Sequence, residues 1–500
     1  MVKTAFSIKT KLDTCLLDDK IELIIQRRKI TMVFSSLTFL LFFLPITLLL
    51  YFLFKNSTYR NSILLIVSLL FYAWGEPKWI FVMLLTVSVN YVCGLLIAKT
   101  EQKGLRTLWM LLGVSLSIGF LFYFKYCGFL LDTFTSLTKI EHSFVAPVLP
   151  IGISFYTFQV LTYTIDVYRG KTSSQRSFFK LLLYISFFPQ LIAGPIVNYK
   201  DIENQLDKRT ITMDRFYEGF LRFLIGFNKK ILIANTCGEL TEKLTSAGEF
   251  SVAGAWLLAL AYSLQIYFDF SGYSDMAIGI GKMFGFHFLE NFNYPYRSKS
   301  ITEFWRNWHI SLGAFFRDYV YIPLGGNRLG IPRQILNIFI VWMLTGIWHG
   351  ASWNFVVWGV YYGVLLIIEK MFFLKIKEKL PAIVNIVTTL FFVIIGWVLF
   401  YYIDLGDGLA HLKIMFGLSG NVLSNAASVY YGKHYAAFLL VGILASFPWK
   451  VLLAKWFSEE NKVISTVASY AKPVAVTLLF LVSLGLLVGQ SYNPFLYFRF

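Results

Sequence analysis

The feature that most constrains this chain is a repeated run of uncharged, mostly apolar residues, each long enough to cross a bilayer as a helix. A helix needs about 20 residues to span a hydrocarbon core of ~30 Å. Runs of this kind cover residues 34–54, 79–98, 107–124, 142–165, 181–199, 250–268, 334–368, 380–403 and 473–498. Shorter runs at 61–75 and 434–449 and a weaker one at 216–234 raise the expected total to about ten to twelve spans.

These runs are apolar on every side, whereas a strand of a membrane β-barrel alternates apolar and polar residues over ~10 positions. We therefore expect an all-α, multi-pass protein of the cell membrane, with re-entrant or interfacial helices where charges interrupt an apolar run. The composition, 57% apolar and 15% charged, fits this class. The net charge of +17 lies in short blocks between the runs, which favours contact with membrane lipid and excludes a nucleic-acid partner.

The loop charges predict an orientation. Loops 55–60, 99–106 and 169–180 carry an excess of Lys and Arg, whereas loops 75–78 and 132–146 are balanced or acidic. Because basic loops favour the cytoplasm, we expect these three on the cytoplasmic side and the start of the first span outside.

Residues 1–31 conflict with this orientation, because their basic cluster at positions 27–29 also favours the cytoplasm. The conflict disappears if translation begins at Met32, so we expect residues 1–31 to be an extension and 32–500 to be one integral membrane domain. The alternative is a short cytoplasmic tail followed by an inverted or re-entrant first segment. The charged stretch 201–215 is expected to be a loop.

One histidine, His349, interrupts the uncharged run 334–368. A straight helix over that run would extend about 52 Å, far beyond the hydrocarbon core, so the helix is expected to break or turn. Gly346 and Gly350 bracket the histidine and mark the expected break. An ionisable side chain inside a membrane is a functional candidate, and a hydrogen-bonded core histidine is the structural alternative.

Residues 301–328 combine charges with an apolar face at helical spacing, which predicts an interfacial or re-entrant helix carrying His309. The apolar face comprises Phe304, Trp308, Leu312, Phe315 and Tyr319. Arg306, Arg317 and Asp318 interrupt any spanning run and are candidates for contact with a substrate. A charged face that is only solvated is the structural alternative.

A third polar group, in residues 266–281, comprises Asp269, Tyr273 and Asp275, which directly follow an uncharged run. Carboxylates near lipid need partners. We consider these residues as substrate contacts and, equally, as groups that bond to neighbouring helices.

Other chemistries lack their sequence patterns. The chain has no Walker loop, no G-x-G-x-x-G following a strand, and no H-E-x-x-H motif. No cluster of His, Cys and carboxylate residues has the spacing of metal ligands, so we expect no metal and no bound cofactor.

Four segments together resemble the membrane-bound O-acyltransferases, most closely the bacterial alginate O-acetyltransferase branch. They are FDFSGYSDMAIGIGKMFGF at 268–286, NFNYPYRSKSITEFWRNWHISLGAFFRDYVYIPLGGNR at 291–328, WHGASWNF at 348–355 and NPFLYF at 493–498. The resemblance extends from Met32 to Phe500, and MVFSSLTFLLFFLP at Met32 is similar to the usual start of that branch.

The resemblance implies a multi-helix membrane enzyme that moves an acetyl group from cytoplasmic acetyl-CoA toward an extracytoplasmic polysaccharide. It also implies that His349 is catalytic and that His309 is a second active-site residue. Such enzymes usually work with a separate extracytoplasmic acetyltransferase.

The chemistry suits these residues. A neutral imidazole, with an ordinary pKa of ~6.5, accepts a proton from a hydroxyl that attacks a thioester, and a positioned general base contributes ~10² to 10⁴ in rate. We expect His349 to be this base, with His309 orienting the thioester or stabilising developing negative charge. Arg306, Arg317, Arg328 and Arg333 either bind coenzyme A phosphates or anchor the chain at the cytoplasmic surface.

Three other functions compete with this one. Peptidoglycan O-acetylation and D-alanyl transfer to teichoic acid belong to the same enzyme class and differ in acceptor or donor. A transporter of a polysaccharide or lipid intermediate is the alternative from another class, but the internal repeats typical of many transporters are missing from the sequence.

Overall fold

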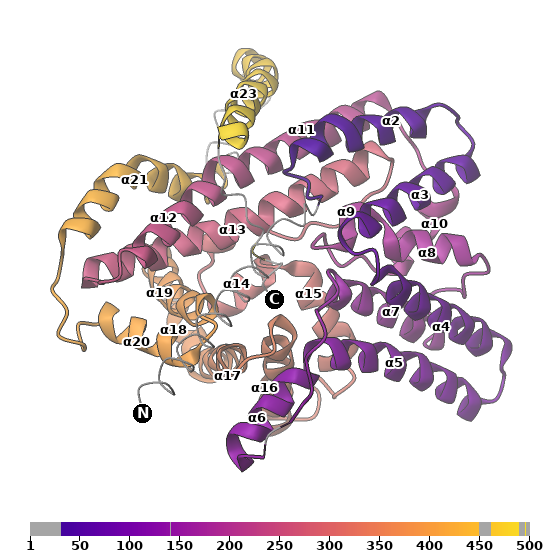
Figure 1. Ribbon diagram of the computed structural model, residues 1–500, viewed down its shortest axis with the longest axis horizontal. Helices are drawn as coiled ribbons and strands as arrows, with labels where there is room; N and C mark the ends of the chain where they lie inside the picture. Colours follow the sequence, from indigo (N-terminus) through magenta and orange to yellow (C-terminus); the bar gives the residue numbers. More distant parts are fainter. Residues whose placement is uncertain (1–31, 141, 450–461, 490–495, 497–500) are drawn as a thin grey trace, which may run out of the picture.

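The computed structural model describes residues 32–140, 142–449, 462–489 and 496, and helices dominate them (Figure 1). Within these ranges the only β pairing is an isolated antiparallel bridge between Phe292 and Trp308. Residues 1–31, and with them the question of the start at Met32, lie outside the described part of the chain. The expected all-α fold is confirmed.

The N-terminal half contains the elements η1 (Phe39–Phe43), α2 (Leu44–Phe52), α3 (Ser57–Gly75), α4 (Ile80–Lys99), α5 (Lys103–Lys125), α6 (Cys127–Thr138), α7 (Ile153–Tyr168), α8 (Phe178–Ser186), α9 (Phe188–Leu191) and α10 (Tyr199–Asp207). The middle of the chain contains α11 (Met213–Asn228), η2 (Lys229–Asn235), α12 (Thr236–Ser246), α13 (Val252–Met283), η3 (Pro295–Arg297), α14 (Ile301–Asn307), α15 (Ile310–Phe316) and η4 (Arg317–Tyr321). The C-terminal part contains α16 (Ile331–His349), α17 (Trp353–Ile368), η5 (Glu369–Phe373), α18 (Leu374–Lys377), α19 (Ala382–Tyr401), α20 (Leu405–Met415), α21 (Ala426–Ala445) and α23 (Lys462–Gly489).

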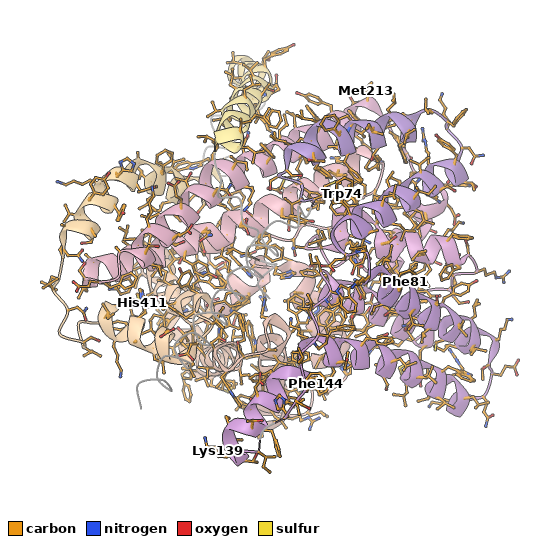
Figure 2. The ribbon with its side chains drawn as sticks, viewed as in Figure 1. Trp74, Phe81, Lys139, Phe144, Met213 and His411 are labelled. Atoms are coloured by element: carbon orange, nitrogen blue, oxygen red, sulfur yellow. The ribbon has the colours of Figure 1, made fainter. Side chains whose placement is uncertain are left out.

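Among the described residues, seven helices are long and apolar enough to cross a membrane. They are Ile80–Lys99, Lys103–Lys125, Val252–Met283, Ile331–His349, Trp353–Phe373, Ala382–Tyr401 and Thr466–Gly489. Other expected runs form shorter or more polar helices, such as α3 and α7, so this count is smaller than the expected total. Apolar side chains cover the outside, as Phe81, 70% exposed, illustrates in Figure 2. The chain is a multi-pass membrane protein.

Two sequence-based expectations about individual segments are wrong. The run 181–199 does not form one span: α8 ends at Ser186, α9 restarts with Pro189 in its first turn, and the chain then runs on without helix to Asn198. Proline removes a helical hydrogen bond and clashes with the preceding turn, which explains the break. The stretch 201–215 is not a loop throughout, because α10 buries Tyr199, Ile202 and Leu206 on one face.

The long helix α13 (Figure 1) joins the two larger of the three apolar cores that the described residues form. The C-terminal half of α13, from Phe270 to Met283, packs into a core formed by the N-terminal helices. The preceding part, from Leu258 to Phe268, packs into a second core formed with α12, α14, α17 and α19. The two histidine-bearing segments lie where these two cores meet. Beside His309, Trp308 belongs to the second core and Leu312 to the first; beside His349, Trp348 belongs to the first core and Phe355 to the second.

Small residues allow α11 and α13 to approach closely. A Cβ atom on Gly226 of α11 would lie 2.5 Å from the carbonyl oxygen of Gly272 on α13, so no larger residue fits without separating the helices. Helix association in membranes depends on such close packing, because lipid tails are as apolar as the side chains they replace. This contact holds α13, the long helix that belongs to both cores, against α11.

The three basic loops lie at one face of the molecule, on the right of Figure 1. The Ser57 hydroxyl donates to the carbonyl of Asp207, and Lys180 forms an ion pair with the Asp207 carboxylate. The Arg106 guanidinium donates to the carbonyl of Tyr168 at 3.2 Å. By contrast, Lys139 lies at the tip of α6, away from this face (Figure 2).

This arrangement supports a test of orientation by single-cysteine labelling. In a background without the four native cysteines, cysteines placed in loops 55–60, 99–106 and 169–180 are expected to resist an impermeant thiol reagent in intact cells and to react after lysis. Lys139→Cys is expected to react in intact cells, because positive-inside bias places the opposite end of α5 outside. Labelling of any of the three loops in intact cells would contradict the orientation.

Candidate active site

The break expected near His349 is confirmed. α16 ends at His349, Gly350 is extended, and α17 begins at Trp353 after the N-cap residue Ser352. The hairpin between α16 and α17 is tight, because a Cβ atom on Gly359 would lie 2.5 Å from the carbonyl oxygen of Trp342. The His349 side chain, 4% exposed, is thus placed at a helix C-terminus inside the protein.

Two consecutive residues at the end of α5 cap the last turn of α16. The Lys125 ammonium group donates to the carbonyl of Trp348 and, at 3.4 Å, to that of His349. The Tyr126 hydroxyl donates to the carbonyl of Ile347 at 3.0 Å. The last carbonyls of a helix lack intrahelical partners, and a cation favours the negative end of the helix dipole. These bonds therefore hold the helix end that carries His349.

Replacing Lys125 with Met is expected to lower both the thermal stability of the protein and the rate of the acetyl transfer that its motifs predict. Each buried acceptor left without a donor costs about 1–3 kcal/mol, and a displaced helix end moves the His349 ring. Melting temperature in detergent and transfer per folded molecule measure the two effects. Lys139→Met, at the exposed tip of α6, is the control, and an unchanged Lys125→Met protein would contradict the capping role.

The second histidine lies at a break rather than on a continuous helix, so the expectation of one amphipathic helix across 301–328 is wrong. α14 ends at Asn307, α15 begins at Ile310, and His309 between them has φ 47°, in the left-handed region. This conformation is uncommon for residues other than glycine and requires support from the surroundings. That support includes a hydrogen bond of 3.1 Å between His309 Nδ1 and Asn291 Oδ1.

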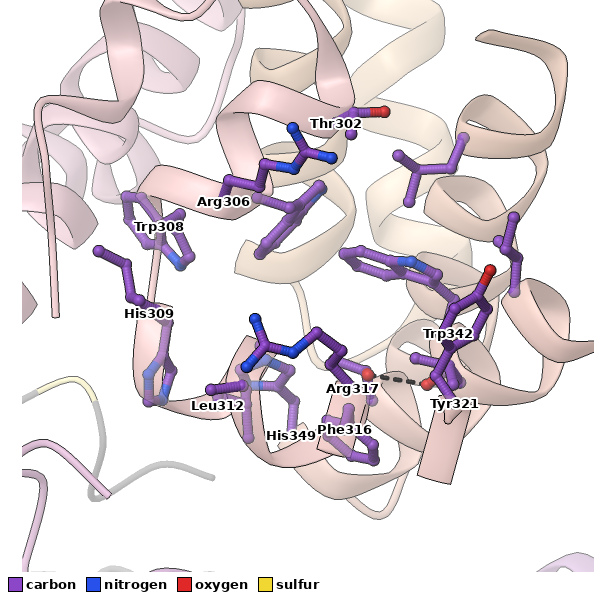
Figure 3. A pocket seen from close by; sticks show the side chains of 18 of the residues that line it. Thr302, Arg306, Trp308, His309, Leu312, Phe316, Arg317, Tyr321, Trp342 and His349 are labelled. Atoms are coloured by element: carbon purple, nitrogen blue, oxygen red, sulfur yellow. Dashed lines mark hydrogen bonds between the residues drawn. The ribbon is translucent and has the colours of Figure 1, made fainter. Parts of the chain in front are cut away.

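Both histidines line one cavity of about 650 Å³ (Figure 3). Both rings also contact the Trp348 indole, with ring centroids 6.1 Å away for His309 and 5.0 Å away for His349. Within the described residues, His349 Nδ1 is buried without a hydrogen-bond partner. A cavity of this size fits a small-molecule substrate, and two imidazoles in its wall supply proton-accepting groups.

The remaining wall of the cavity is mostly apolar and contains three cationic side chains. Arg306 and Arg317, two of the sequence candidates, line the cavity together with Lys370, and no acidic residue is among the described residues that line it. Asp318 does not line the cavity but forms an ion pair with Arg317 at 2.7 Å. The hydrogen bond from Arg317 holds the pKa of the Asp318 carboxyl below its usual range. The cavity therefore favours an anionic ligand.

The other sequence candidates lie outside this cavity. Asp269 is buried in an ion pair with Lys230 and accepts a hydrogen bond from the backbone N–H of Leu496 at 2.9 Å. Tyr273 is buried and stacks on Phe34 with ring centroids 4.6 Å apart. These contacts favour the structural alternative for both residues.

Asp275 forms ion pairs with Arg222 at 2.8 Å and Lys229 at 2.7 Å, so it joins α13 to α11 and η2. Arg328 is exposed on a turn, and Arg333 donates to the carbonyl of Leu324 at 3.1 Å. None of the three lines the cavity.

Sequence reasoning missed three residues of the site: Lys125, Asn291 and Lys370. Lys125 directly follows the uncharged run 107–124, and Lys370 follows the run 334–368 after Glu369, so a charge at the end of each run was visible. Asn291 lies in the quoted segment NFNYPYR, where nothing distinguishes it from Asn293. Across the described residues, no group of three or more His, Cys, Asp or Glu side chains is placed to hold a metal ion.

Comparison with known proteins identifies the family. Residues 71–405 match MBOAT, the membrane-bound O-acyltransferase family. The chain belongs to this family. The family assignment confirms the resemblance stated from the motifs.

Curated relatives of this O-acyltransferase include several envelope-modifying enzymes. The probable alginate O-acetylase AlgI of Pseudomonas putida is 39% identical over 466 residues, covering 88% of this chain and 95% of that protein. The peptidoglycan O-acetyltransferase of Helicobacter pylori is 32% identical over 492 residues, covering 89% of this chain and 92% of that protein. The teichoic acid D-alanyltransferase of Bacillus subtilis is 32% identical over 272 residues, covering 50% of this chain and 68% of that protein.

The family and these relatives establish the class of reaction. The protein is a multi-pass membrane enzyme of the O-acetyltransferase class. Acyl transfer is therefore favoured over the transporter alternative.

Proposed function

We propose that the enzyme moves an acetyl group from cytoplasmic acetyl-CoA to hydroxyl groups of an extracytoplasmic polysaccharide. The observation that carries the proposal is the cavity in which His309 and His349 lie together with Arg306, Arg317 and Lys370. A thioester donor with phosphate groups needs both features: cations for its phosphates and a base beside its acyl group.

The position of the cavity supports a donor that enters from the face of the basic loops. Arg317 is followed by Asp318, whose backbone carbonyl accepts a hydrogen bond from Arg169 in loop 169–180 at 3.2 Å. The Arg169 guanidinium also lies 5.2 Å from the ring centroid of Tyr319. Since positive-inside bias places that loop in the cytoplasm, the cationic part of the cavity adjoins the compartment that supplies acetyl-CoA.

The proposed chemistry is a direct acyl transfer. His349 accepts the proton of the acceptor hydroxyl, the oxygen forms a bond to the thioester carbon, and the carbon–sulfur bond breaks. The proton then passes from His349 to the thiolate of coenzyme A, so the products are an acetyl ester and a free thiol. His309 acts as the second active-site group, and Arg306, Arg317 and Lys370 hold the donor.

The acceptor is proposed from the relatives. Alginate O-acetylases cover most of the chain at higher identity than the D-alanyltransferase, which covers half of it. This favours an acetylated polysaccharide, alginate or a similar exopolysaccharide, over D-alanyl transfer. Peptidoglycan is the second candidate, since its O-acetyltransferase also aligns with most of the chain. A separate extracytoplasmic acetyltransferase is the proposed partner of the enzyme.

Replacing Arg317 with Gln tests the donor assignment. A charge-assisted hydrogen bond contributes about 1.5–3 kcal/mol, so KM for acetyl-CoA is expected to rise roughly 10-fold or more with kcat little changed. S-acetyl-pantetheine, which lacks the phosphates, is expected to have the same KM with the Arg317→Gln protein as with the unmodified enzyme. Arg328→Gln, outside the cavity, is the matched control. Equal KM values for acetyl-CoA in all three proteins would contradict phosphate binding at Arg317.

A further inference from the structure

Asn291 forms several side-chain hydrogen bonds beside His309. Its side chain is fully buried, and its Oδ1 atom lies 3.1 Å from His309 Nδ1, 3.2 Å from Ser311 N and 2.9 Å from Ser311 Oγ. Its Nδ2 atom donates to Ser274 Oγ at 3.1 Å. Backbone pairing brings the two segments together, because Ile310 N–H donates to the carbonyl of Asn291 at 2.9 Å.

These contacts determine which atom of the amide faces the histidine. The backbone N–H of Ser311 can only donate, so the Asn291 atom that it contacts must be the oxygen. The Ser311 hydroxyl agrees, since it accepts from Ile196 N–H at 3.0 Å and its proton points to the same oxygen. The amide orientation thus follows from donors whose direction is fixed, and not from the histidine itself.

The orientation of the Asn291 amide determines which ring nitrogen of His309 carries the proton. An oxygen that already accepts two hydrogen bonds can face His309 Nδ1 favourably only if that nitrogen carries a proton. Ser311 Oγ, at 3.4 Å from Nδ1, is a longer contact that such a proton also satisfies. In the neutral ring, the lone pair is then on Nε2.

We propose that Asn291 is a positioning residue that fixes the Nδ1–H tautomer of His309 and makes Nε2 a hydrogen-bond acceptor. This rests on the proposed role of His309 in acyl transfer and narrows it. A neutral His309 with its lone pair on Nε2 accepts a hydrogen bond from a substrate N–H or O–H group. It does not donate to the developing oxyanion, so it orients a reactant and another group stabilises the negative charge.

The surroundings favour the neutral ring over the imidazolium. His309 is 2% exposed and lies among the rings of Phe155, Phe270 and Trp348. Among the described residues, the charged or titratable groups that line the same cavity are His349, Arg306, Arg317, Tyr321 and Lys370, and Lys125 on α5 reaches the carbonyl of His349. No carboxylate is among these groups, so none of them would stabilise a second proton on His309.

Nitrogen NMR of protein with isotope-labelled histidine tests the tautomer of His309 without an acyl donor or an acyl acceptor present. The His309 resonances, assigned by their loss in His309→Gln, are expected to show a protonated Nδ1 and an unprotonated Nε2. A protonated Nε2 with an unprotonated Nδ1 would overturn the inference. Because no acyl transfer is measured, failure here is distinguishable from failure of the proposed acetyl-CoA reaction.

Two substitutions test the consequence for catalysis. Asn291→Leu removes the acceptor, and transfer per folded molecule is expected to fall about 10-fold or more, since loss of the group that sets a catalytic imidazole's tautomer costs up to ~10⁴ in the Ser-His-Asp triad. Asn291→Asp keeps every acceptor contact and is expected to restore most of the activity. Its carboxylate stabilises the protonated ring, so the acid limb of the pH–rate profile is expected to move to higher pH by about one unit or more.

The control is Asn90→Leu, because Asn90 is equally buried and donates to Thr86 O and Ser117 Oγ while accepting from Thr164 Oγ1. It is expected to lower stability but to leave the pH–rate profile unchanged. If Asn291→Leu does not fold, Asn291→Asp alone decides the question. A folded Asn291→Asp protein that is inactive, or that keeps the unmodified pH–rate profile, would overturn the proposal.

Discussion

Replacing His349 with Gln is expected to lower acetyl transfer at least ~10²-fold, the low end of a general-base contribution. Gln keeps much of the volume and some hydrogen bonding but removes the basic nitrogen. Because Nδ1 of His349 has no hydrogen-bond partner within the described residues, folding loses little when the ring is replaced. Protein level and melting temperature are therefore expected to stay nearly unchanged.

His411 provides the matched structural control. It is also buried, but its Nδ1 contacts the Tyr402 hydroxyl at 2.9 Å and its Nε2 contacts the carbonyl of Ala255 at 3.1 Å. His411 lies on α20, at the left of Figure 2, and does not line the cavity. His411→Gln is expected to lower stability and to keep the activity per folded molecule. Near-normal acetylation by a well-folded His349→Gln protein would defeat the proposed mechanism.

Replacing His309 with Gln is expected to reduce transfer about 10-fold or more while leaving residual activity, because an orienting group contributes less than the base it serves. The double variant His309→Gln, His349→Gln is expected to be little slower than His349→Gln alone, since groups that act as a unit are not additive. Single-turnover rates of the three proteins measure both effects. Fully additive losses would show that the two histidines act independently.

The sequence predicted the region around His349 well, because one physical constraint decided it. A helix over 334–368 exceeds the membrane thickness, so the chain had to turn, and the turn occurs at Gly350 next to the histidine. The run lengths likewise predicted α4, α5 and α19 closely. These elements follow from local composition and the bilayer, and both are readable from the chain itself.

The surroundings of His309 were not predictable in this way. Its left-handed backbone and its bond to Asn291 depend on pairing between residues 291–293 and 307–310, which helical periodicity does not reveal. Periodicity also placed Asp269 and Asp275 as site candidates, whereas Asp269 pairs with Lys230 of η2 and Asp275 with Arg222 of α11. Polar residues near lipid need partners, but the sequence does not say which ones.

The most direct test of the central claim is transfer of labelled acetyl groups by the purified enzyme in proteoliposomes, with acetyl-CoA supplied at the face of the basic loops. Alginate, peptidoglycan and teichoic acid are offered at the opposite face, with and without an extracytoplasmic acetyltransferase partner. The account predicts base-labile label on a polysaccharide, release of one free coenzyme A thiol per ester formed, and loss of both with His349→Gln. Absence of enzyme-dependent thiol release under every condition, or transfer only from a D-alanyl carrier-protein thioester, would contradict it.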